Sequence, residues 1–237
     1  MLVNVTIPVY NEEKILPSSI ATLHAFLTHH CRFDWEIVVA NNASTDNTLG
    51  VAQSLSREFS GVRVVHLDQK GRGRALKQVW TQSMADILAY MDVDLSSNLY
   101  AFPPMIEALI SGGFDLATGS RLLKGSTTKR SMRREIISRG YNLLVKAFFF
   151  TKFSDAQCGF KALTKRAAQN LLPKVTDTGW FFDTELLVIA EKLGYRIFDL
   201  PVSWVEDLDT RVKIARTALD DIQGLIRVRR NFWKGLY

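Results

Sequence analysis

The sequence predicts an α/β fold in which a mostly parallel, Rossmann-like central sheet is flanked by helices. Apolar, strand-like runs alternate with helix-like segments through the first half of the chain, which is the order expected when helices connect parallel strands. The 237 residues are 47% hydrophobic, which suits one large core. Since no repeat or linker interrupts them, we expect a single domain over residues 1–237.

The first half supplies strands and helices in strict alternation. Strands are expected at residues 2–9, 35–40, 62–67 and 87–91. Helices are expected between them, from the Asn11 region to about His29, from the N-cap segment 44–46 through Phe59, and from Gly71 to about Met84. The carboxyl ends of such strands meet at one edge, where ligands bind. Tyr10, Asn41, Lys70 and Asp92 each follow a strand end, so we expect them to gather along this edge.

The second half is less regular. It predicts a helix at 103–111, a strand at 115–118, a basic stretch at 121–139 and an apolar helix at 141–150. Residues 155–163 are expected to return to the core, followed by a helix at 184–193, a strand at 196–205 and a long C-terminal helix at 212–233. The main part of the domain would cover about 2–210, and 211–237 would form a basic, aromatic amphipathic helix.

Two carboxylates follow the strand at 87–91. Asp92 and Asp94 are two residues apart, so in an extended segment they point to one face. They repel each other unless a cation lies between them, and Mg²⁺ or Mn²⁺ binds one or two carboxylates together with phosphate oxygens. The pair therefore predicts a metal site for a diphosphate, with a solvated turn as the alternative.

The formal net charge of +6 indicates an anionic partner, such as nucleotide phosphates or an anionic membrane surface. No groove-reading motif for nucleic acid is present, so we expect no nucleic-acid partner. No apolar stretch approaches the roughly 20 residues of a membrane span. Cys31 and Cys158 lack metal-ligand spacing, and the N-terminus lacks a basic n-region. We expect a cytoplasmic protein, peripheral on the cytoplasmic membrane face.

Six segments occur in an order and spacing that resemble family-2 glycosyltransferases with the GT-A fold, over roughly residues 2–210. They are Ile7 to Glu13, Val38 to Thr48, Lys70 to Gly73, Met91 to Leu95, Gly119 to Arg121 and Asp155 to Lys161. Within the family, the chain most resembles polyprenyl-phosphate sugar synthases of the dolichyl-phosphate mannose synthase type. The resemblance implies an inverting enzyme that moves one sugar from a UDP- or GDP-linked donor to a polyprenyl, dolichyl-type phosphate.

The resemblance also implies roles by position. The nucleoside pocket would be lined by Pro8, Tyr10 and Glu12, and the base would meet Asn41. The segment from Lys70 to Gly73 would lie near the nucleotide, and residues 155–160 would border the donor sugar. The metal and the donor would bind Asp92 and Asp94, and Arg121 would face the phosphates. The acceptor loop, formed by the basic stretch, would bind the lipid phosphate through Arg121, Arg139 and Arg134. Asp183 would be a base or a sugar contact.

Three departures from the family pattern bear on these roles. Asn41 and Asn42 stand where the family usually has two aspartates, which leaves the base open. Ser96 replaces a glutamine of the lipid-phosphate branch, so a third metal ligand at Ser96 is open. The Gln-x-x-Arg-Trp motif of polysaccharide synthases does not occur, which argues against a processive polymerase.

Several alternatives remain at this point. A family-2 enzyme acting on a hydroxyl of a glycan or lipid-linked saccharide would need a general base, and a weakly catalytic nucleotide-binding protein would explain the Asn41 and Ser96 departures. Arg211 is expected either near the phosphates or in a surface ion-pair cluster. The C-terminal helix is either a membrane-surface anchor, with a possible membrane partner subunit, or a solvated helix.

Overall fold

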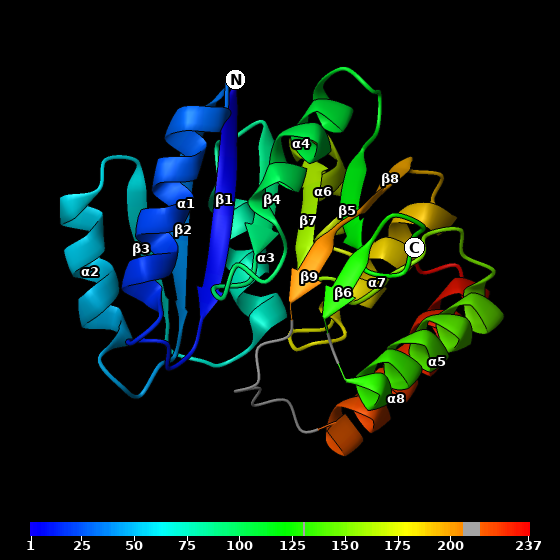
Figure 1. Ribbon diagram of the computed structural model, residues 1–237. Helices are drawn as coiled ribbons and strands as arrows, with labels where there is room; N and C mark the ends of the chain where they lie inside the picture. The colour runs from blue at the N-terminus through cyan, green and yellow to red at the C-terminus, as the bar shows by residue number, and fades with distance from the viewer. Residues whose placement is uncertain (130, 206–213) are drawn as a thin grey trace.

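The computed structural model describes residues 1–129, 131–205 and 214–237, with the side chains of 214–216 left aside. In these residues seven strands form one sheet in the order β3-β2-β1-β4-β7-β5-β8 (Figure 1). They are β1 (Leu2–Val9), β2 (Asp34–Asn42), β3 (Val62–Leu67), β4 (Ile87–Met91), β5 (Leu116–Ser120), β7 (Phe160–Thr164) and β8 (Ile197–Pro201). Two short strands, β6 (Thr127–Lys129) and β9 (Ser203–Val205), pair separately.

The main sheet is mostly parallel, as predicted. β1 pairs in parallel with β2 and β4, and β2 with β3. β7 runs antiparallel to both β4 and β5, while β5 and β8 are parallel to each other. The strands predicted in the first half are all confirmed.

Helices cover both faces of the sheet (Figure 1). They are α1 (Leu16–His30), α2 (Thr48–Glu58), α3 (Arg72–Gln82), α4 (Phe102–Ile110), α5 (Met132–Phe149), α6 (Lys165–Leu171), α7 (Phe182–Lys192) and α8 (Ile214–Trp233), with a 3₁₀ turn at Leu99–Ala101. One core joins α1, α2 and α4 to the sheet, and the other joins α3, α5, α6, α7 and α8. The alternation in β1 explains this division, because Val3, Val5 and Ile7 face the first core.

Several predicted boundaries were wrong. α1 begins at Leu16 and not near Asn11, and the N-cap of α2 is Asn47 and not a residue of 44–46. The helix predicted from residue 141 begins at Met132, so half of the basic stretch is helical rather than loop. Glu135 in its first turn complements the helix dipole. The strand predicted at 196–205 divides into β8 and β9, because β5 ends at Ser120, opposite Pro201, and Ser203 then pairs with Thr127.

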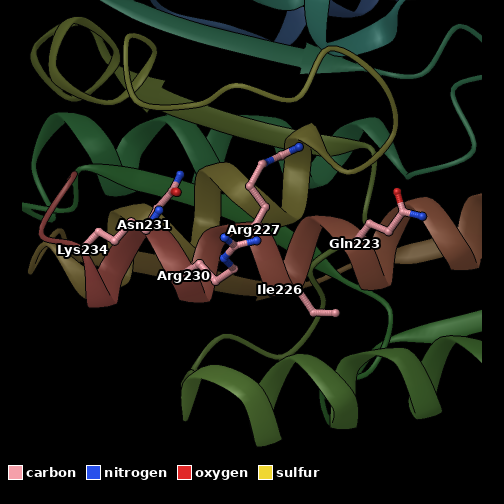
Figure 2. A pocket seen from close by; sticks show the side chains of 6 residues that line it. All are labelled: Gln223, Ile226, Arg227, Arg230, Asn231 and Lys234. Atoms are coloured by element: carbon pink, nitrogen blue, oxygen red, sulfur yellow. The ribbon is translucent and has the colours of Figure 1, made fainter.

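α5 and α8 pack side by side, at the edge of the molecule that lies lower right in Figure 1. Figure 2 shows side chains of this end of the chain that line a hollow of about 280 Å³, among them Ile226, Arg230 and Lys234. The predicted C-terminal helix is confirmed from Ile214, while Arg211 lies outside the described residues. No described helix combines the length and apolarity required to cross a membrane.

Candidate active site

The two predicted metal-binding carboxylates lie in a tight turn at the carboxyl end of β4. The turn closes when the backbone N–H of Leu95 donates to the carbonyl of Asp92 at 3.1 Å, and Leu95 takes a positive φ of 50°. The N–H of Ser96 donates to Asp94 Oδ1 at 3.0 Å. The chain after the turn is fixed by Val205, whose N–H donates to the carbonyl of Ser96. Asp92 and Asp94 are thus held at the sheet edge where ligands of such folds bind.

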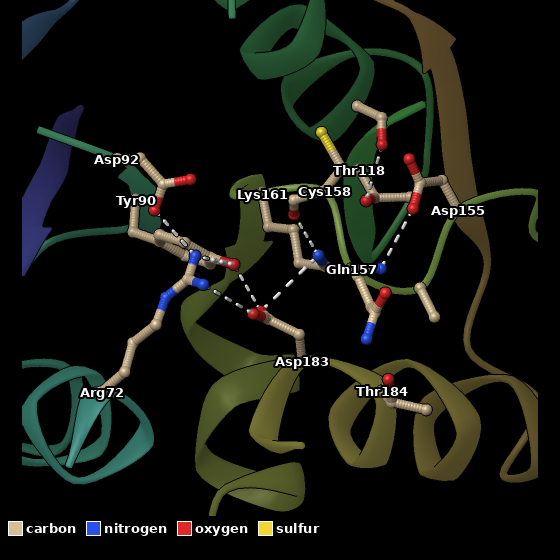
Figure 3. Close-up of polar contacts among 12 residues, drawn as sticks. Arg72, Tyr90, Asp92, Thr118, Asp155, Gln157, Cys158, Lys161, Asp183 and Thr184 are labelled. Carbon is tan, nitrogen blue, oxygen red and sulfur yellow. Dashed lines mark hydrogen bonds and ion pairs between the residues drawn. The ribbon is translucent and has the colours of Figure 1, made fainter. Parts of the chain in front are cut away.

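Asp92 already has a cationic partner. The Nη2 group of Arg72 donates to Asp92 Oδ1 at 2.9 Å and to the Tyr90 hydroxyl at 3.2 Å (Figure 3). Arg72 is brought there by two glycines at the start of α3. A Cβ at Gly71 would lie 2.5 Å from the carbonyl oxygen of Thr178, and one at Gly73 would lie 2.6 Å from the Phe182 Cβ. Only glycine at these two positions therefore allows the start of α3 to pack against the segment from Thr178 to Phe182.

Asp183, in the first turn of α7, is buried among donors and cations. It accepts a short hydrogen bond from the Tyr90 hydroxyl. Its carboxylate oxygens lie 3.5 Å from Lys161 Nζ and 3.7 Å from Arg72 Nη1 (Figure 3). Lys161 also donates to the carbonyl of Cys158. These contacts suit a residue that fixes the positions of Tyr90, Lys161 and Arg72. Because its carboxylate oxygens already have these partners, Asp183 is poorly placed to accept a proton from a substrate.

Negative charge is concentrated at the end of β4. Burial raises the pKa of Asp92, and the carboxylates of Asp94 and Asp183 add to the rise, while Arg72 and Lys161 oppose it. The oxygens of Asp92 and Asp94 are ligands that Mg²⁺ and Mn²⁺ prefer. The described residues contain no group of three or more His, Cys, Asp or Glu side chains arranged to hold an ion. The donor set fits a cation that completes its coordination with water and phosphate oxygens.

The predicted phosphate-binding Arg121 is held by a buried carboxylate. Its Nε and Nη2 groups donate to the two oxygens of Asp155 at 2.7 and 3.0 Å. Burial favours the neutral form of Asp155, but Arg121 outweighs this effect and lowers the pKa to about 2. The guanidinium also lies 5.4 Å from the ring centroid of Trp204. Arg121 therefore has a fixed position beside the carboxylate turn.

The predicted nucleoside side lies at the ends of β1 and β2. Asn41 is fully buried, and its Nδ2 lies 2.7 Å from His66 Nδ1. Within the described chain its Oδ1 is buried without a hydrogen-bonding partner. Asn42 has a structural use, since its Oδ1 accepts from the N–H of Gly71 at 2.7 Å. A ligand could donate to this acceptor only after the side chains that cover it move aside.

Other predicted nucleoside residues surround this point. Lys70 Nζ lies 3.3 Å from the ring centroid of Tyr10. Pro8 is partly buried near the end of β1. The N–H of Glu12 donates to Thr48 Oγ1 at 2.8 Å, which ties the segment after β1 to the start of α2. Tyr10 and Asp92 directly follow β1 and β4, and Lys70 follows β3 after two residues, whereas Asn41 is the penultimate residue of β2 and not, as was predicted, the residue after a strand. Because these strands are parallel, all four residues lie at one edge of the sheet.

The predicted acceptor residues come from two different parts of the fold. Arg134 and Arg139 lie on α5 rather than on a loop. Arg139 Nε donates to Glu135 Oε1 at 2.5 Å, and the arginine side chain is 61% exposed. Among the described residues, no hydrogen bond or ion pair joins Arg139 to the Arg121–Asp155 pair.

Sequence reasoning gave no individual role to four residues that build this site, namely Arg72, Tyr90, Gly159 and Lys161, although it expected segments 70–73 and 155–160 to lie near the donor. Arg72 and Lys161 are basic residues inside two of the motif segments, and Lys161 lies in an otherwise apolar strand, which was the available signal. A Cβ at Gly159 would lie 1.8 Å from Asp92 Oδ2, a contact that no spacing in the sequence reveals.

The family profile described as Glycosyl transferase family 2 matches residues 4–172. The chain belongs to this family. The resemblance inferred from the six segments is therefore confirmed. The relatives compared below are named glycosyltransferases, which is the enzyme class predicted from the sequence.

Two curated relatives are similar over most of the chain. "Glycosyltransferase AglD" of Haloferax volcanii is 35% identical over 98% of this chain, which spans only 37% of that relative's length. "Dolichyl-phosphate beta-glucosyltransferase" of Mus musculus is 33% identical over a match that covers 86% of this chain and 67% of that relative's length.

A solved structure is similar in fold. Glucosyl-3-phosphoglycerate synthase from Mycobacterium tuberculosis, in complex with Mn²⁺, uridine diphosphate and phosphoglyceric acid, matches with a TM-score of 0.75. The match covers 96% of this chain and 78% of that chain at 19% identity. This likeness confirms the predicted GT-A fold.

Proposed function

We propose that this chain moves a single sugar from a nucleotide diphosphate to a polyprenyl, dolichyl-type phosphate, with inversion at the anomeric carbon. The main support is the pair of carboxylates, Asp92 and Asp94, held at the carboxyl edge of the sheet beside Arg121. Relatives of this family-2 chain that are named dolichyl-phosphate beta-glucosyltransferases favour the lipid phosphate as acceptor.

The nucleoside would bind between the ends of β1 and β2. The buried, unpartnered Oδ1 of Asn41 suits the ring N–H that uracil and guanine both carry, so either a UDP- or a GDP-linked donor fits. Tyr10 would pack on the base or ribose, with Pro8 and Glu12 beside it. Lys70, which lies over the Tyr10 ring, would turn toward the diphosphate.

The metal would be Mg²⁺ or Mn²⁺, held by Asp92 and Asp94, with Ser96 as a further candidate ligand. When bound, such an ion neutralises the charge that develops on a leaving diphosphate. Asp94 is oriented for this role by the Ser96 N–H, while Asp92 accepts a hydrogen bond from Arg72 that a bound ion would replace. Arg121 would add positive charge near the phosphates.

The acceptor would be oriented and not deprotonated. A phosphate monoester has a second pKa of about 6, so it is already a nucleophilic anion near neutral pH. Arg121, Arg134 and Arg139 would hold it and reduce its repulsion from the donor diphosphate. For Arg139 this means exchanging Glu135 for the phosphate.

The competing reaction is transfer to a hydroxyl group, which needs a general base. Asp183 is the residue that was expected to be either that base or a sugar contact. Its carboxylate accepts from Tyr90 and lies beside Lys161 and Arg72. We therefore assign it to positioning the sugar and its neighbours, and we retain the phosphate acceptor.

The membrane surface would be approached by α5 and α8. Both helices expose large apolar side chains, including Met132, Ile136, Leu143, Leu219 and Trp233. Basic residues accompany them, namely Arg133 and Arg139 on α5 and Arg229, Arg230 and Lys234 at the end of the chain. Apolar and basic residues together favour an anionic lipid surface, and a membrane partner subunit could add to this contact.

The test is a transfer assay with purified protein, Mg²⁺ or Mn²⁺, radiolabelled nucleotide sugars and a short polyprenyl phosphate. Label in the organic phase with one donor would support the proposal and identify the sugar and base. Label that appears only on hydroxylated acceptors would replace it with the competing reaction. Tight nucleotide binding without transfer to any acceptor would favour a weakly catalytic nucleotide-binding protein.

A further inference from the structure

Arg72 supplies a fixed positive charge at the place where the proposed function puts a divalent cation. Its guanidinium lies 2.9 Å from Asp92 Oδ1 and 3.7 Å from Asp183 Oδ2. The guanidinium carbon also lies 4.8 Å from the ring centroid of Trp180, and only 11% of the side chain is exposed. An arginine is charged at all accessible pH values, so Asp92 is neutralised before any metal arrives.

The position of Arg72 is unfavourable for its own helix. It is the first residue of α3, and a cation at a helix N-terminus opposes the helix dipole. Within the described chain its Nε is buried without a hydrogen-bonding partner, which leaves one of its donors unused. The favourable free energy that holds Arg72 in this position therefore comes from its ion pairs with Asp92 and Asp183, and not from the helix dipole of α3.

Binding of a divalent cation to Asp92 without nucleotide is unfavourable for two reasons. The cation must replace Arg72 as the partner of Asp92, and it is repelled by the guanidinium that remains nearby. A nucleotide diphosphate brings negative charge that offsets both positive groups. The cation and the diphosphate should therefore bind more tightly together than either does alone, and by linkage each raises the affinity of the other.

We propose that Arg72 is a positioning residue that reserves Asp92 until the nucleotide diphosphate arrives, so that the divalent cation binds with the nucleotide and not before it. This inference rests on the proposed function, because it assumes that Asp92 and Asp94 bind the cation. It adds a role for Arg72 that the transfer reaction itself does not require.

The test measures Mn²⁺ binding by electron paramagnetic resonance, with and without UDP or GDP. For the wild-type protein we expect the nucleotide to tighten Mn²⁺ binding at least tenfold. Because Arg72→Gln removes the positive charge that lies 2.9 Å from Asp92 Oδ1, it should tighten Mn²⁺ binding to the nucleotide-free protein by about tenfold or more. Arg72→Lys, which keeps the charge, should stay near the wild-type value.

Lys77→Gln is the matched control, because it removes one positive charge from the same helix, where Lys77 Nζ donates to the carbonyl of Val175 at 2.8 Å. It should leave Mn²⁺ binding unchanged. An Arg72→Gln protein that binds Mn²⁺ without nucleotide no more tightly than wild type would overturn the inference. If Arg72→Gln does not fold, the wild-type measurement decides, since equal Mn²⁺ affinity with and without nucleotide also overturns it.

Asp94→Ala separates this inference from the proposed function. If Mn²⁺ binding in the nucleotide complex does not depend on Asp94, the metal site of the proposed function is wrong, and the inference fails with it. If binding depends on Asp94 but is the same in Arg72→Gln and wild type, only the role of Arg72 is wrong.

Discussion

The guanidinium of Arg121 donates two hydrogen bonds to the carboxylate of Asp155, which lies 34 residues away in the sequence. The bonds are 2.7 Å long from Nε and 3.0 Å long from Nη2. Asp155 is fully buried, and the Arg121 side chain is 13% exposed. The N–H groups of Arg121 and Gln157 donate to the same carboxylate. This pair therefore joins the end of β5 to the loop before β7, next to the carboxylate turn.

Asp155→Asn should be strongly destabilising, because it leaves the buried Arg121 without a counter-ion. Breaking a buried ion pair costs about 3–5 kcal/mol, which urea unfolding at pH 7 would measure. The exposed Asp34, whose side chain is 82% exposed beside the N-terminal amine, is the control. Asp34→Asn should change the free energy of unfolding by less than about 1 kcal/mol.

The same pair predicts an acid dependence. The pKa of Asp155 is lowered to about 2 from 3.8, so the stabilisation is present above pH 4 and is lost as the pH falls toward 2. The difference between wild type and Asp155→Asn should shrink over that interval. A difference that stays constant down to pH 2 would contradict the assigned ion pair.

Gly159→Ala should disable the site while keeping the fold. Its Cβ would lie 1.8 Å from Asp92 Oδ2, so the carboxylate must move, and a misplacement of about 1 Å costs roughly 100-fold in turnover. The control is Gly140→Ala on α5, where an added Cβ meets nothing within 4 Å. That variant should keep full turnover and gain up to about 1 kcal/mol in stability. Equal turnover in the two variants would contradict the assigned place of Asp92.

Asp221 on α8 should make stability fall as the pH rises. Burial, and then Asp177 and Asp220, raise its pKa from 3.8 to about 7, while Gln157 Nε2 donates to its carboxylate at 3.1 Å. The folded protein keeps this proton between pH 4 and 7 and the unfolded chain does not, so folding loses free energy across that window.

Asp221→Asn removes the titrating group. Relative to wild type it should gain roughly 1–3 kcal/mol above pH 7 and little at pH 4, measured by urea unfolding across the range. Asp220→Asn, at the exposed neighbouring position, should give a much smaller change. A gain for Asp221→Asn that does not vary with pH would refute the shifted pKa.

Leu219 and Trp233 should contribute to membrane binding, since they are 62% and 76% exposed on α8. Burying a large apolar side chain contributes about 1.5–3 kcal/mol, so the double change to serine should weaken binding to vesicles of phosphatidylglycerol and phosphatidylcholine by at least about tenfold. Met84→Ser removes an apolar side chain that is 81% exposed between α3 and β4 and should have no effect. Unchanged sedimentation of the double variant with vesicles would exclude this face.

Local sequence patterns were sufficient to predict the strands in the first half of the fold. Each strand from β1 to β4 contains a short apolar run, and because the four strands are parallel, the residues at or after their carboxyl ends lie at one edge of the sheet, namely Tyr10, Asn41, Lys70 and Asp92. The boundary of α5 was missed because its first turns are basic and polar. Those residues form good helices, but they do not show the apolar periodicity by which helices are recognised.

The contacts inside the site could not be predicted in the same way. Arg121 was expected to face phosphates, and its partner Asp155 lies in another motif segment. Arg72 reaches Asp92 only because Gly71 and Gly73 permit a close approach to the Thr178–Phe182 region. These are tertiary relationships, and spacing along the chain carries no information about which of several nearby charges will pair.

The central claim is that Asp94 binds the metal and the donor diphosphate during transfer to a polyprenyl phosphate. The most direct measurement compares organic-phase label formed by wild type and Asp94→Ala, with their thermal unfolding recorded in parallel. The account predicts label that requires Mg²⁺ or Mn²⁺, and a loss of at least about 100-fold in the variant with its fold intact. Near-normal transfer by a folded Asp94→Ala protein would contradict it.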